Sequence, residues 1–198
     1  MGHKYGVKAV RKVVESCVEL GVEHLTLYAF STENWNRPKF EIDALMNLLV
    51  SSLKKELPTF LENGVTLNTI GNIESLPLKC QKELNDCIDK TSNECKLQLN
   101  LALSYSSRWE ILNAVREIVT DKENGNLNKQ IDEDVFNKYL QTNDIPEPEL
   151  MIRTSGEYRI SNFLLWQLAY TELYFTEVLW PDFDEKEFYK AIFEYQKR

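Results

Sequence analysis

Apolar and polar residues follow two different periods along this chain, and the two periods predict its secondary structure. Short, nearly continuous apolar runs predict strands that are covered on both faces of a parallel sheet. Longer segments with apolar residues three and four positions apart predict amphipathic helices. The predicted strands are 25–30, 65–70, 97–103, 150–152 and 172–175. The predicted helices are 7–20, 41–63, 76–93, 109–121, 132–139, 163–169 and 185–197.

The order of these strands and helices predicts the fold class. Helices that alternate with strands are typical of an α/β protein, in which helices cover both faces of a parallel, doubly wound sheet. The chain contains no internal repeat, low-complexity segment or linker between the predicted elements. We therefore expect residues 1–198 to form a single domain.

The composition limits the function classes that the chain can belong to. Of its 198 residues, 43% are hydrophobic and 27% are charged, as in ordinary soluble globular domains. The net charge of −8 argues against nucleic acid as a partner, because a nucleic-acid surface needs a basic face. Two histidines are too few for a histidine-rich metal cage. The four cysteines form no CxxC pair, so we expect free thiols in a reducing cytoplasm.

Three polar loops directly follow predicted strands, at residues 31–37, 104–108 and 153–161. The carboxyl ends of parallel strands lie at one edge of the sheet, where ligands bind in open α/β folds. The last loop carries Arg153, Arg159 and Ser161 and precedes a predicted helix. Guanidinium groups and a helix N-terminus both favour phosphate. The pattern predicts a phosphate or diphosphate site, and the alternative is a surface turn with two solvated arginines.

Motifs of several other enzyme classes do not occur in the chain. No GxxxxGK[ST] loop supports a P-loop nucleotide enzyme, and no GxGxxG supports a dinucleotide site. No GxSxG elbow supports serine hydrolysis. The predicted diphosphate site therefore needs another explanation.

Four segments carry a resemblance that covers essentially the whole chain. They are GHKYG at residues 2–6, YAFSTENWNRP at 28–38, IRTSGEYRISNF at 152–163 and ELYFTEVLWPDF at 172–183. Together they resemble the cis-prenyltransferase family, and most closely the bacterial isoprenyl transferases that make undecaprenyl diphosphate. The resemblance implies a homodimeric, Mg²⁺-dependent enzyme that condenses isopentenyl diphosphate onto an allylic diphosphate, usually farnesyl diphosphate, with a new cis double bond at each addition.

The resemblance also implies where this activity belongs in the cell. The product would be a long polyprenyl diphosphate such as undecaprenyl diphosphate, the precursor of a lipid carrier for cell-wall synthesis. We expect a cytoplasmic enzyme that touches the inner membrane surface transiently while its product leaves.

The resemblance assigns roles to individual residues. The diphosphate of isopentenyl diphosphate would be bound by Arg153, Arg159, Ser161 and the backbone of Ile160. The residues expected at the reacting groups are Ser31, Asn34 and His3, with Asn34 directing the path of the departing proton. The rest of the substrate loop would be Thr32, Glu33, Trp35 and Arg37, and Glu172 would bind Mg²⁺. Judged by their residue types alone, Trp35 is equally well explained by core packing and Glu172 by a charge at a strand edge.

The chain departs from the family pattern in three places. In the family, a first strand and an Asp-Gly-Asn-Gly-Arg-Trp loop precede the histidine, and a short basic tail follows the last helix. Residues 104–108 are Ser-Tyr-Ser-Ser-Arg, where the family more commonly has Asn-Tyr-Gly-Gly-Arg. We expect the domain to be truncated at both ends, and the 198-residue chain by itself to be nearly inactive, because it lacks the aspartate of the family loop.

Two further hypotheses compete with a chain-elongating transferase. One is a non-catalytic cis-prenyltransferase-like subunit that binds an active partner, and the other is a generic diphosphate-binding protein. The intact loops around Asn34 and Arg153 favour the enzyme, because a binding subunit does not need them. For the homodimer, we expect an interface in the aromatic-rich C-terminal third, around Trp166, Tyr170, Tyr174 and Trp180.

Overall fold

The computed structural model describes the backbone of residues 2–94 and 96–198, and the side chains of residues 6–94 and 96–198. Its helices are α1 (Gly2–Leu20), α2 (Lys39–Asn63), α3 (Leu78–Thr91), α4 (Ser107–Glu123), α5 (Glu133–Asn137) and α6 (Glu185–Tyr195). Its strands are β1 (His24–Ser31), β2 (Val65–Ile70), β3 (Leu97–Tyr105), β4 (Leu150–Arg153) and β5 (Glu172–Phe175). Three short 3₁₀ turns are η1 (Thr32–Asn36), η2 (Ile73–Ser75) and η3 (Trp180–Asp182). Apart from their ends, all predicted strands and all predicted helices except 163–169 are confirmed.

The centre of the fold is a three-stranded parallel sheet in the order β1–β3–β2. Leu99 in β3 lies between Leu25 of β1 and Leu67 of β2. The strands β4 and β5 form a second parallel pair, in which Arg153 lies beside Phe175. Every strand pair is parallel, so the predicted α/β fold class is confirmed. The strands are divided between two hydrogen-bonded groups, and within the described residues β1 pairs only with β3 and β4 only with β5.

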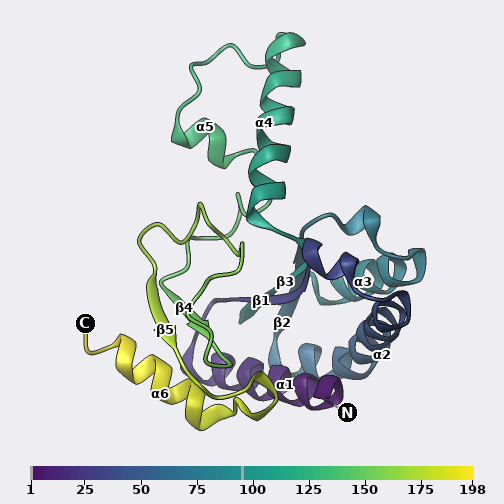
Figure 1. Ribbon diagram of the computed structural model, residues 1–198, viewed down its shortest axis with the longest axis vertical. Coiled ribbons are helices and arrows are strands. Elements are labelled where there is room, and N and C mark those ends of the chain that lie inside the picture. The colour runs from purple at the N-terminus through teal and green to yellow at the C-terminus, as the bar shows by residue number, and fades with distance from the viewer. Residues whose placement is uncertain (1, 95) are drawn as a thin grey trace.

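Both faces of the three-stranded sheet are covered, as nearly continuous apolar strands require. On one face, the leucines of β3 pack against α1, α2 and α3 in the main hydrophobic core. On the other face, Ala102 packs with Phe163 and Leu164 from the segment between β4 and β5. Figure 1 shows that α4 leaves the end of β3 and projects away from the sheet, with α5 beside it.

The prediction of a helix over residues 163–169 is wrong. Residues 161–170 form a succession of turns and bends instead. Ser161, Asn162 and Leu164 have φ angles of 53°, 61° and 47°, which belong to the left-handed region and cannot continue a right-handed helix. The carbonyl and the side chain of Asn162 bind the first turn of α4. Contacts with a distant part of the chain thus override the local preference of this apolar run.

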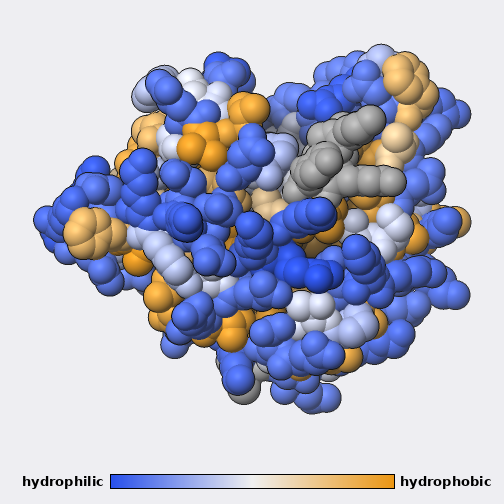
Figure 2. All heavy atoms as spheres, turned by 90° about the horizontal axis from the view of Figure 1, so that it is seen from below, coloured by the Kyte–Doolittle hydropathy of each residue, from blue (hydrophilic) through white to orange (hydrophobic). Residues whose placement is uncertain are grey.

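The surface and the described cysteines add two observations. The face drawn in Figure 2 is mostly hydrophilic, and its apolar side chains gather in small, separate groups. Within the part of the chain that the structure describes, every helix is too short or too polar to cross a membrane. Cys17, Cys80 and Cys87 are buried free thiols, as predicted, and Cys95 lies outside the described residues.

We predict that Gly71 is a position at which a side chain disrupts the fold. Gly71 has a φ of 120°, and a Cβ atom there would lie 2.0 Å from the carbonyl oxygen of Leu103 in β3. Gly71→Ala should therefore lower the free energy of unfolding by about 2–5 kcal/mol, which combines left-handed strain with overpacking.

Gly125 provides the matched control, because it also has a positive φ of 73° but has open space around its Cβ position. Gly125→Ala should cost only the strain, about 1–2 kcal/mol. Urea denaturation of the two variants measures the difference. Equal losses in the two variants would show that the contact with Leu103 has no energetic effect.

Candidate functional site

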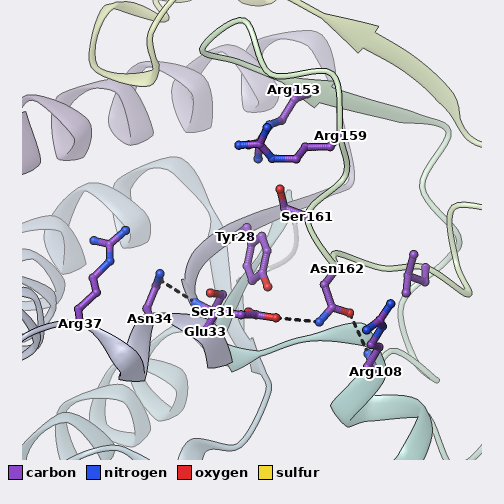
Figure 3. Close-up of a pocket in the computed structure, with 11 residues that line it drawn as sticks. Tyr28, Ser31, Glu33, Asn34, Arg37, Arg108, Arg153, Arg159, Ser161 and Asn162 are labelled. Atoms are coloured by element: carbon purple, nitrogen blue, oxygen red, sulfur yellow. Dashed lines mark hydrogen bonds between the residues drawn. The ribbon is translucent and has the colours of Figure 1, made fainter.

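A pocket of about 810 Å³ lies where the polar loops after β1, β3 and β4 meet (Figure 3). Its lining residues are Tyr28, Ser31, Glu33, Asn34, Arg37, Arg108, Arg153, Arg159, Ser161, Asn162 and Leu165. All three loops that were predicted to converge contribute to this lining. The parallel register explains the convergence, since Ser31 at the end of β1 lies beside Tyr105 at the end of β3.

The pocket is strongly positive, although the chain as a whole is acidic. Four arginines line it, and Glu33 is the single carboxylate among the lining residues. The net charge of the whole chain is −8. Guanidinium groups that gather in one cavity repel one another unless an anion lies between them. An anion with several oxygen atoms, such as a diphosphate, can accept a pair of hydrogen bonds from each guanidinium.

Arg153 and Arg159 form the part of this charge that is best placed for an anion. Their guanidinium groups point into the same region of the pocket, and Ser161 lies below them in Figure 3. The Nε atom of Arg153 is buried and has no hydrogen-bond partner among the described atoms. Arg159 forms an ion pair with Glu157, and both side chains are partly exposed. A buried donor without a partner is costly, so Arg153 is prepared to donate to a ligand.

The N-terminus of α4 opens at the same pocket and replaces the helix that was expected after Ser161. This helix has 17 residues, and its first turn includes Arg108. Ser107 and Arg108 donate their backbone N–H groups to the carbonyl and Oδ1 of Asn162, at 2.9 and 3.0 Å. The positive end of the α4 dipole therefore adds to the positive potential of the pocket. The backbone N–H groups of Ser107 and Arg108 themselves are already hydrogen-bonded to Asn162.

The loop after β1 holds Asn34 in a fixed orientation. The backbone N–H of Ser31 donates to Asn34 Oδ1 at 3.1 Å. Because the amide oxygen is bound in this way, the amide nitrogen of Asn34 is the group that can donate to a ligand. Asn34 and Ser31 both line the pocket, as the resemblance implied for them.

Glu33 lies between this loop and the Arg159 loop. Its Oε1 accepts a hydrogen bond of 2.9 Å from Asn162 Nδ2, and its Oε2 accepts one of 3.3 Å from the Thr32 hydroxyl. Burial alone would raise the pKa of Glu33, but hydrogen bonds from Asn162, the backbone and nearby hydroxyls outweigh it and hold the pKa below its usual range. Glu33 is therefore ionised at neutral pH and acts as an acceptor.

Aromatic and buried polar groups support the pocket from behind. Tyr28 stacks on Phe163 at 4.5 Å and donates its hydroxyl to the carbonyl of Tyr105 at 3.0 Å. Burial raises the pKa of Tyr28 to about 12, so Tyr28 stays neutral at physiological pH. The buried Glu110 carboxylate accepts hydrogen bonds from the Tyr105 hydroxyl at 2.6 Å and from Gln167 Nε2 at 3.0 Å. These bonds fix the turn segment that follows Asn162.

Several predicted site residues lie elsewhere. Trp35 is partly buried; it packs edge-to-face on Phe30 at 5.0 Å against the main core and donates to Ser104 Oγ at 2.9 Å. Thr32 and Ile160 are next to the pocket in sequence but do not line it. The side chain of His3 lies outside the described residues.

Glu172 also lies away from the pocket. It begins β5 and pairs with Leu150, whereas Arg153 lies beside Phe175 at the other end of the same two strands. Three residues of strand separate the two positions by about 10 Å. The Glu172 carboxylate forms an ion pair with Arg198.

The described residues do not form a protein-held Mg²⁺ site by themselves. Within them, no group of three or more His, Cys, Asp or Glu side chains could hold a metal ion. Glu33 is bound to Asn162 and Glu172 to Arg198. Mg²⁺ prefers near-octahedral oxygen ligands and often takes most of them from substrate phosphates and water. These side chains alone therefore do not fit the ion.

Sequence reasoning missed four of the lining residues, which are Tyr28, Arg108, Asn162 and Leu165. Arg108 belonged to a loop that was expected at the site, so its position carried a signal. Tyr28 lies inside a predicted strand, and Leu165 was assigned to a helix. Asn162 appeared only as a member of the segment at residues 152–163, and its contact with Glu33 spans 129 positions of the chain.

Comparisons with known proteins agree over the whole chain. The family model described as "Putative undecaprenyl diphosphate synthase" matches residues 1–198. An isoprenyl transferase of Clostridium tetani is 49% identical over 199 residues, which cover 100% of this chain and 78% of that protein. An isoprenyl transferase of Chlorobaculum tepidum is 50% identical over 198 residues, which cover 100% of this chain and 75% of that protein.

Two solved structures are similar as well. Lavandulyl diphosphate synthase from Lavandula x intermedia, in complex with dimethylallyl diphosphate, has a TM-score of 0.95 at 34% identity. That match covers 99% of this chain and 85% of the synthase. A probable undecaprenyl diphosphate synthase from Campylobacter jejuni has a TM-score of 0.87 at 37% identity and covers 98% of this chain and 90% of that protein.

We predict that inorganic pyrophosphate binds this pocket and stabilises the protein. At a concentration of 100 Kd it should add about 2.7 kcal/mol of stability, or roughly 5–10 °C in Tm for a domain of this size. Arg153→Ala should abolish most of the shift, and salt should reduce it because the attraction is electrostatic.

Arg116→Ala is the matched control, because Arg116 is an exposed arginine of α4 outside the pocket. Differential scanning fluorimetry with increasing pyrophosphate measures both variants. An unchanged shift in Arg153→Ala would remove Arg153 from the anion site.

Proposed function

Because this chain belongs to the undecaprenyl diphosphate synthase family of isoprenyl transferases, we propose that it condenses isopentenyl diphosphate onto an allylic diphosphate, with farnesyl diphosphate as the starter. The observation that carries this proposal is the set of four arginines in one pocket of a chain with a net charge of −8. Both substrates are diphosphates, so such a pocket suits them. The proposed product is a long cis-polyprenyl diphosphate such as undecaprenyl diphosphate.

The diphosphate of isopentenyl diphosphate is proposed to bind at Arg153, Arg159 and Ser161. The buried Nε of Arg153 has no partner among the described atoms, and a phosphate oxygen would supply one. Arg159 would exchange its ion pair with Glu157 for a charge-assisted bond to the same ligand. Arg37 and Arg108, which also line the pocket, add positive charge for the allylic diphosphate.

In the proposed reaction, one carbon–oxygen bond breaks and one carbon–carbon bond forms. The C1–O bond of the allylic diphosphate breaks and pyrophosphate leaves with the electron pair. The alkene of isopentenyl diphosphate then bonds to that C1 atom through its terminal C4 atom, and a proton is lost from C2. The arginines stabilise the charge that develops on the leaving diphosphate.

Asn34 is proposed to direct the departing proton. An amide is a poor base, so it is not the final acceptor. The Asn34 oxygen is held by the Ser31 N–H group, which leaves the amide nitrogen to donate to a diphosphate oxygen. That contact would place the oxygen where it can accept the proton from C2.

Mg²⁺ remains part of the proposal as a requirement for activity. A bound ion would supply countercharge to the leaving diphosphate. The described side chains do not form its site, so diphosphate oxygens and water are proposed as most of its ligands.

The assembly and location of the enzyme are also proposed. An apolar stripe on α4 consists of Leu112, Val115 and Val119, which are 54%, 44% and 48% exposed and lie on one side of the helix. Tyr170 is 96% exposed. We propose that the α4 stripe and Tyr170 of one protomer lie in the interface of a homodimer, where the partner protomer covers them. We also propose that the enzyme is cytoplasmic and contacts the membrane surface when its apolar product leaves for cell-wall synthesis.

The other aromatic residues expected at this interface are less available. Trp166 packs on Phe136 of α5 at 4.5 Å and donates to Asn137 Oδ1 at 2.8 Å. Trp180 stacks on Phe183 at 5.9 Å beside the main core. The interface is therefore proposed nearer to α4 than the sequence suggested.

We predict that the purified protein lengthens farnesyl diphosphate in the presence of isopentenyl diphosphate and Mg²⁺. Mass spectrometry should detect longer prenyl diphosphates and released pyrophosphate. Arg153→Ala and Arg159→Ala should each raise the KM for isopentenyl diphosphate by about 10- to 100-fold, since a charge-assisted hydrogen bond is worth roughly 1.5–3 kcal/mol.

Chelation of Mg²⁺ should abolish elongation. Binding of isopentenyl diphosphate by the protein without any elongation would contradict the proposed enzyme. That outcome would favour the non-catalytic binding subunit instead.

We predict that Val115→Asp separates the proposed dimer into monomers, because a buried, unpaired charge is costly at an interface. Thr120→Asp adds the same charge to α4 on a different side of the helix and should leave the dimer intact. Sedimentation at micromolar concentration measures both variants. A monomeric wild-type protein would contradict the proposed assembly.

A further inference from the structure

One side chain joins three segments around the pocket, and the activity proposed above does not use it directly. Asn162 Oδ1 accepts the backbone N–H of Arg108 at 3.0 Å, and its carbonyl accepts that of Ser107 at 2.9 Å. Its Nδ2 donates to Glu33 Oε1 at 2.9 Å. Figure 3 shows Asn162 between Glu33 and Arg108, at the edge of the pocket. Asn162 therefore links the loop after β1, the start of α4 and the loop after β4.

The chemistry of this position explains why an asparagine occupies it. Asn162 has a φ of 61°, and asparagine tolerates the left-handed region better than most residues. Its amide also accepts one hydrogen bond and donates another at the same time, which neither a carboxylate nor an apolar side chain can do. The position thus requires both the backbone freedom and the two-sided side chain.

Asn162 and Glu33 are each next in sequence to a residue that is proposed to bind isopentenyl diphosphate. Asn162 directly follows Ser161 and lies three residues after Arg159, which are proposed to bind the diphosphate. Glu33 directly precedes Asn34, which is proposed to act at the alkene. Both Asn162 and Glu33 line the pocket. A bond between them sets the distance between the diphosphate-binding group and the reacting group.

We propose that Asn162 is a positioning residue that holds the Asn34 loop in register with the diphosphate-binding loop through its hydrogen bond to Glu33. This inference rests on the proposed function and assigns a role to a residue that touches neither reacting atom. The diphosphate would still bind without the bond, because Arg153 and Arg159 remain. The alkene would then lie out of line with Asn34, and a misplacement of about 1 Å can cost on the order of a hundredfold in rate.

The test reverses the polarity of the hydrogen bond between Asn162 and Glu33. Asn162→Asp keeps the acceptor for the Arg108 N–H group but places a second carboxylate opposite Glu33. We expect kcat to fall by about 10- to 100-fold, while the KM for isopentenyl diphosphate changes by less than about threefold. Adding Glu33→Gln returns a donor to the pair, so the double variant should regain at least about tenfold in kcat over Asn162→Asp alone.

A pH profile separates this role from general damage to the fold. In Asn162→Asp, the two facing carboxylates repel each other at neutral pH and can share a proton as the pH falls. The kcat of this variant relative to wild type should therefore rise toward acidic pH. If the substitution only destabilised the fold, the kcat of the variant relative to wild type would not rise toward acidic pH.

The chain offers a matched control for the substitution. Asn113 Nδ2 donates to Glu117 Oε1 at 2.7 Å on the exposed surface of α4, away from the pocket. Asn113→Asp disturbs the same kind of contact and should leave kcat and KM unchanged. The pyrophosphate-induced shift in Tm should persist in Asn162→Asp, because the anion site is intact.

Each remaining outcome is decisive. A wild-type kcat in Asn162→Asp, or a double variant no faster than Asn162→Asp, would overturn the positioning role. If circular dichroism shows that Asn162→Asp does not fold, Glu33→Ala removes the same bond from the other side, and a wild-type kcat there would overturn it as well. A wild-type protein that does not elongate prenyl diphosphates would instead overturn the proposed function, and this inference with it.

Discussion

The carboxyl end of β3 is completely buried, and every polar group there has to find a partner inside the protein. Ser104 Oγ accepts hydrogen bonds from Trp35 and Ser75, and the carbonyl of Tyr105 accepts one from Tyr28. The carbonyl of Leu103 leaves room only for a glycine at Gly71. Because unpaired buried polar groups are costly, these hydrogen bonds fix the loops after β1 and β2 relative to α4. They therefore determine the shape of the pocket.

The pocket concentrates positive charge that the rest of the chain does not share. An acidic surface lowers non-specific attraction to polyanions, whereas a local group of arginines keeps a strong potential for a small anionic ligand. Arg37 follows β1, Arg108 lies in the first turn of α4, and Arg153 and Arg159 lie at the end of β4 and in the loop after it, so no single element bears the mutual repulsion. Buried support at Glu110 and Tyr105, together with the α4 dipole, holds this arrangement before a ligand arrives. Preorganised charge of this kind is what the departure of a diphosphate requires.

Binding and alignment are separate tasks in this site, and different contacts perform them. In the proposed reaction, Arg153 and Arg159 would attract a diphosphate through charge, which tolerates small shifts in position. The Asn34 loop is proposed instead to meet one particular part of the substrate, which would require a fixed distance. The hydrogen bond between Asn162 and Glu33 provides such a distance because it joins the two loops directly. A substitution could thus lower the catalytic rate without lowering the affinity for the substrate, or lower the affinity without lowering the rate.

The sequence by itself determined the strands, nearly all helices and the convergence of three polar loops, because hydrophobic period and strand direction are local properties. It also singled out Arg153, Arg159, Ser161, Ser31 and Asn34 through motifs that lie in continuous segments. The tertiary structure alone decided that Trp35 packs in the core, that Glu172 lies at the far end of β5, and that residues 161–170 turn instead of forming a helix. Each of these depends on register or on a hydrogen bond between segments far apart in the chain, such as Asn162 with Glu33. Such contacts leave no periodic trace in the sequence, because their partners are selected by packing.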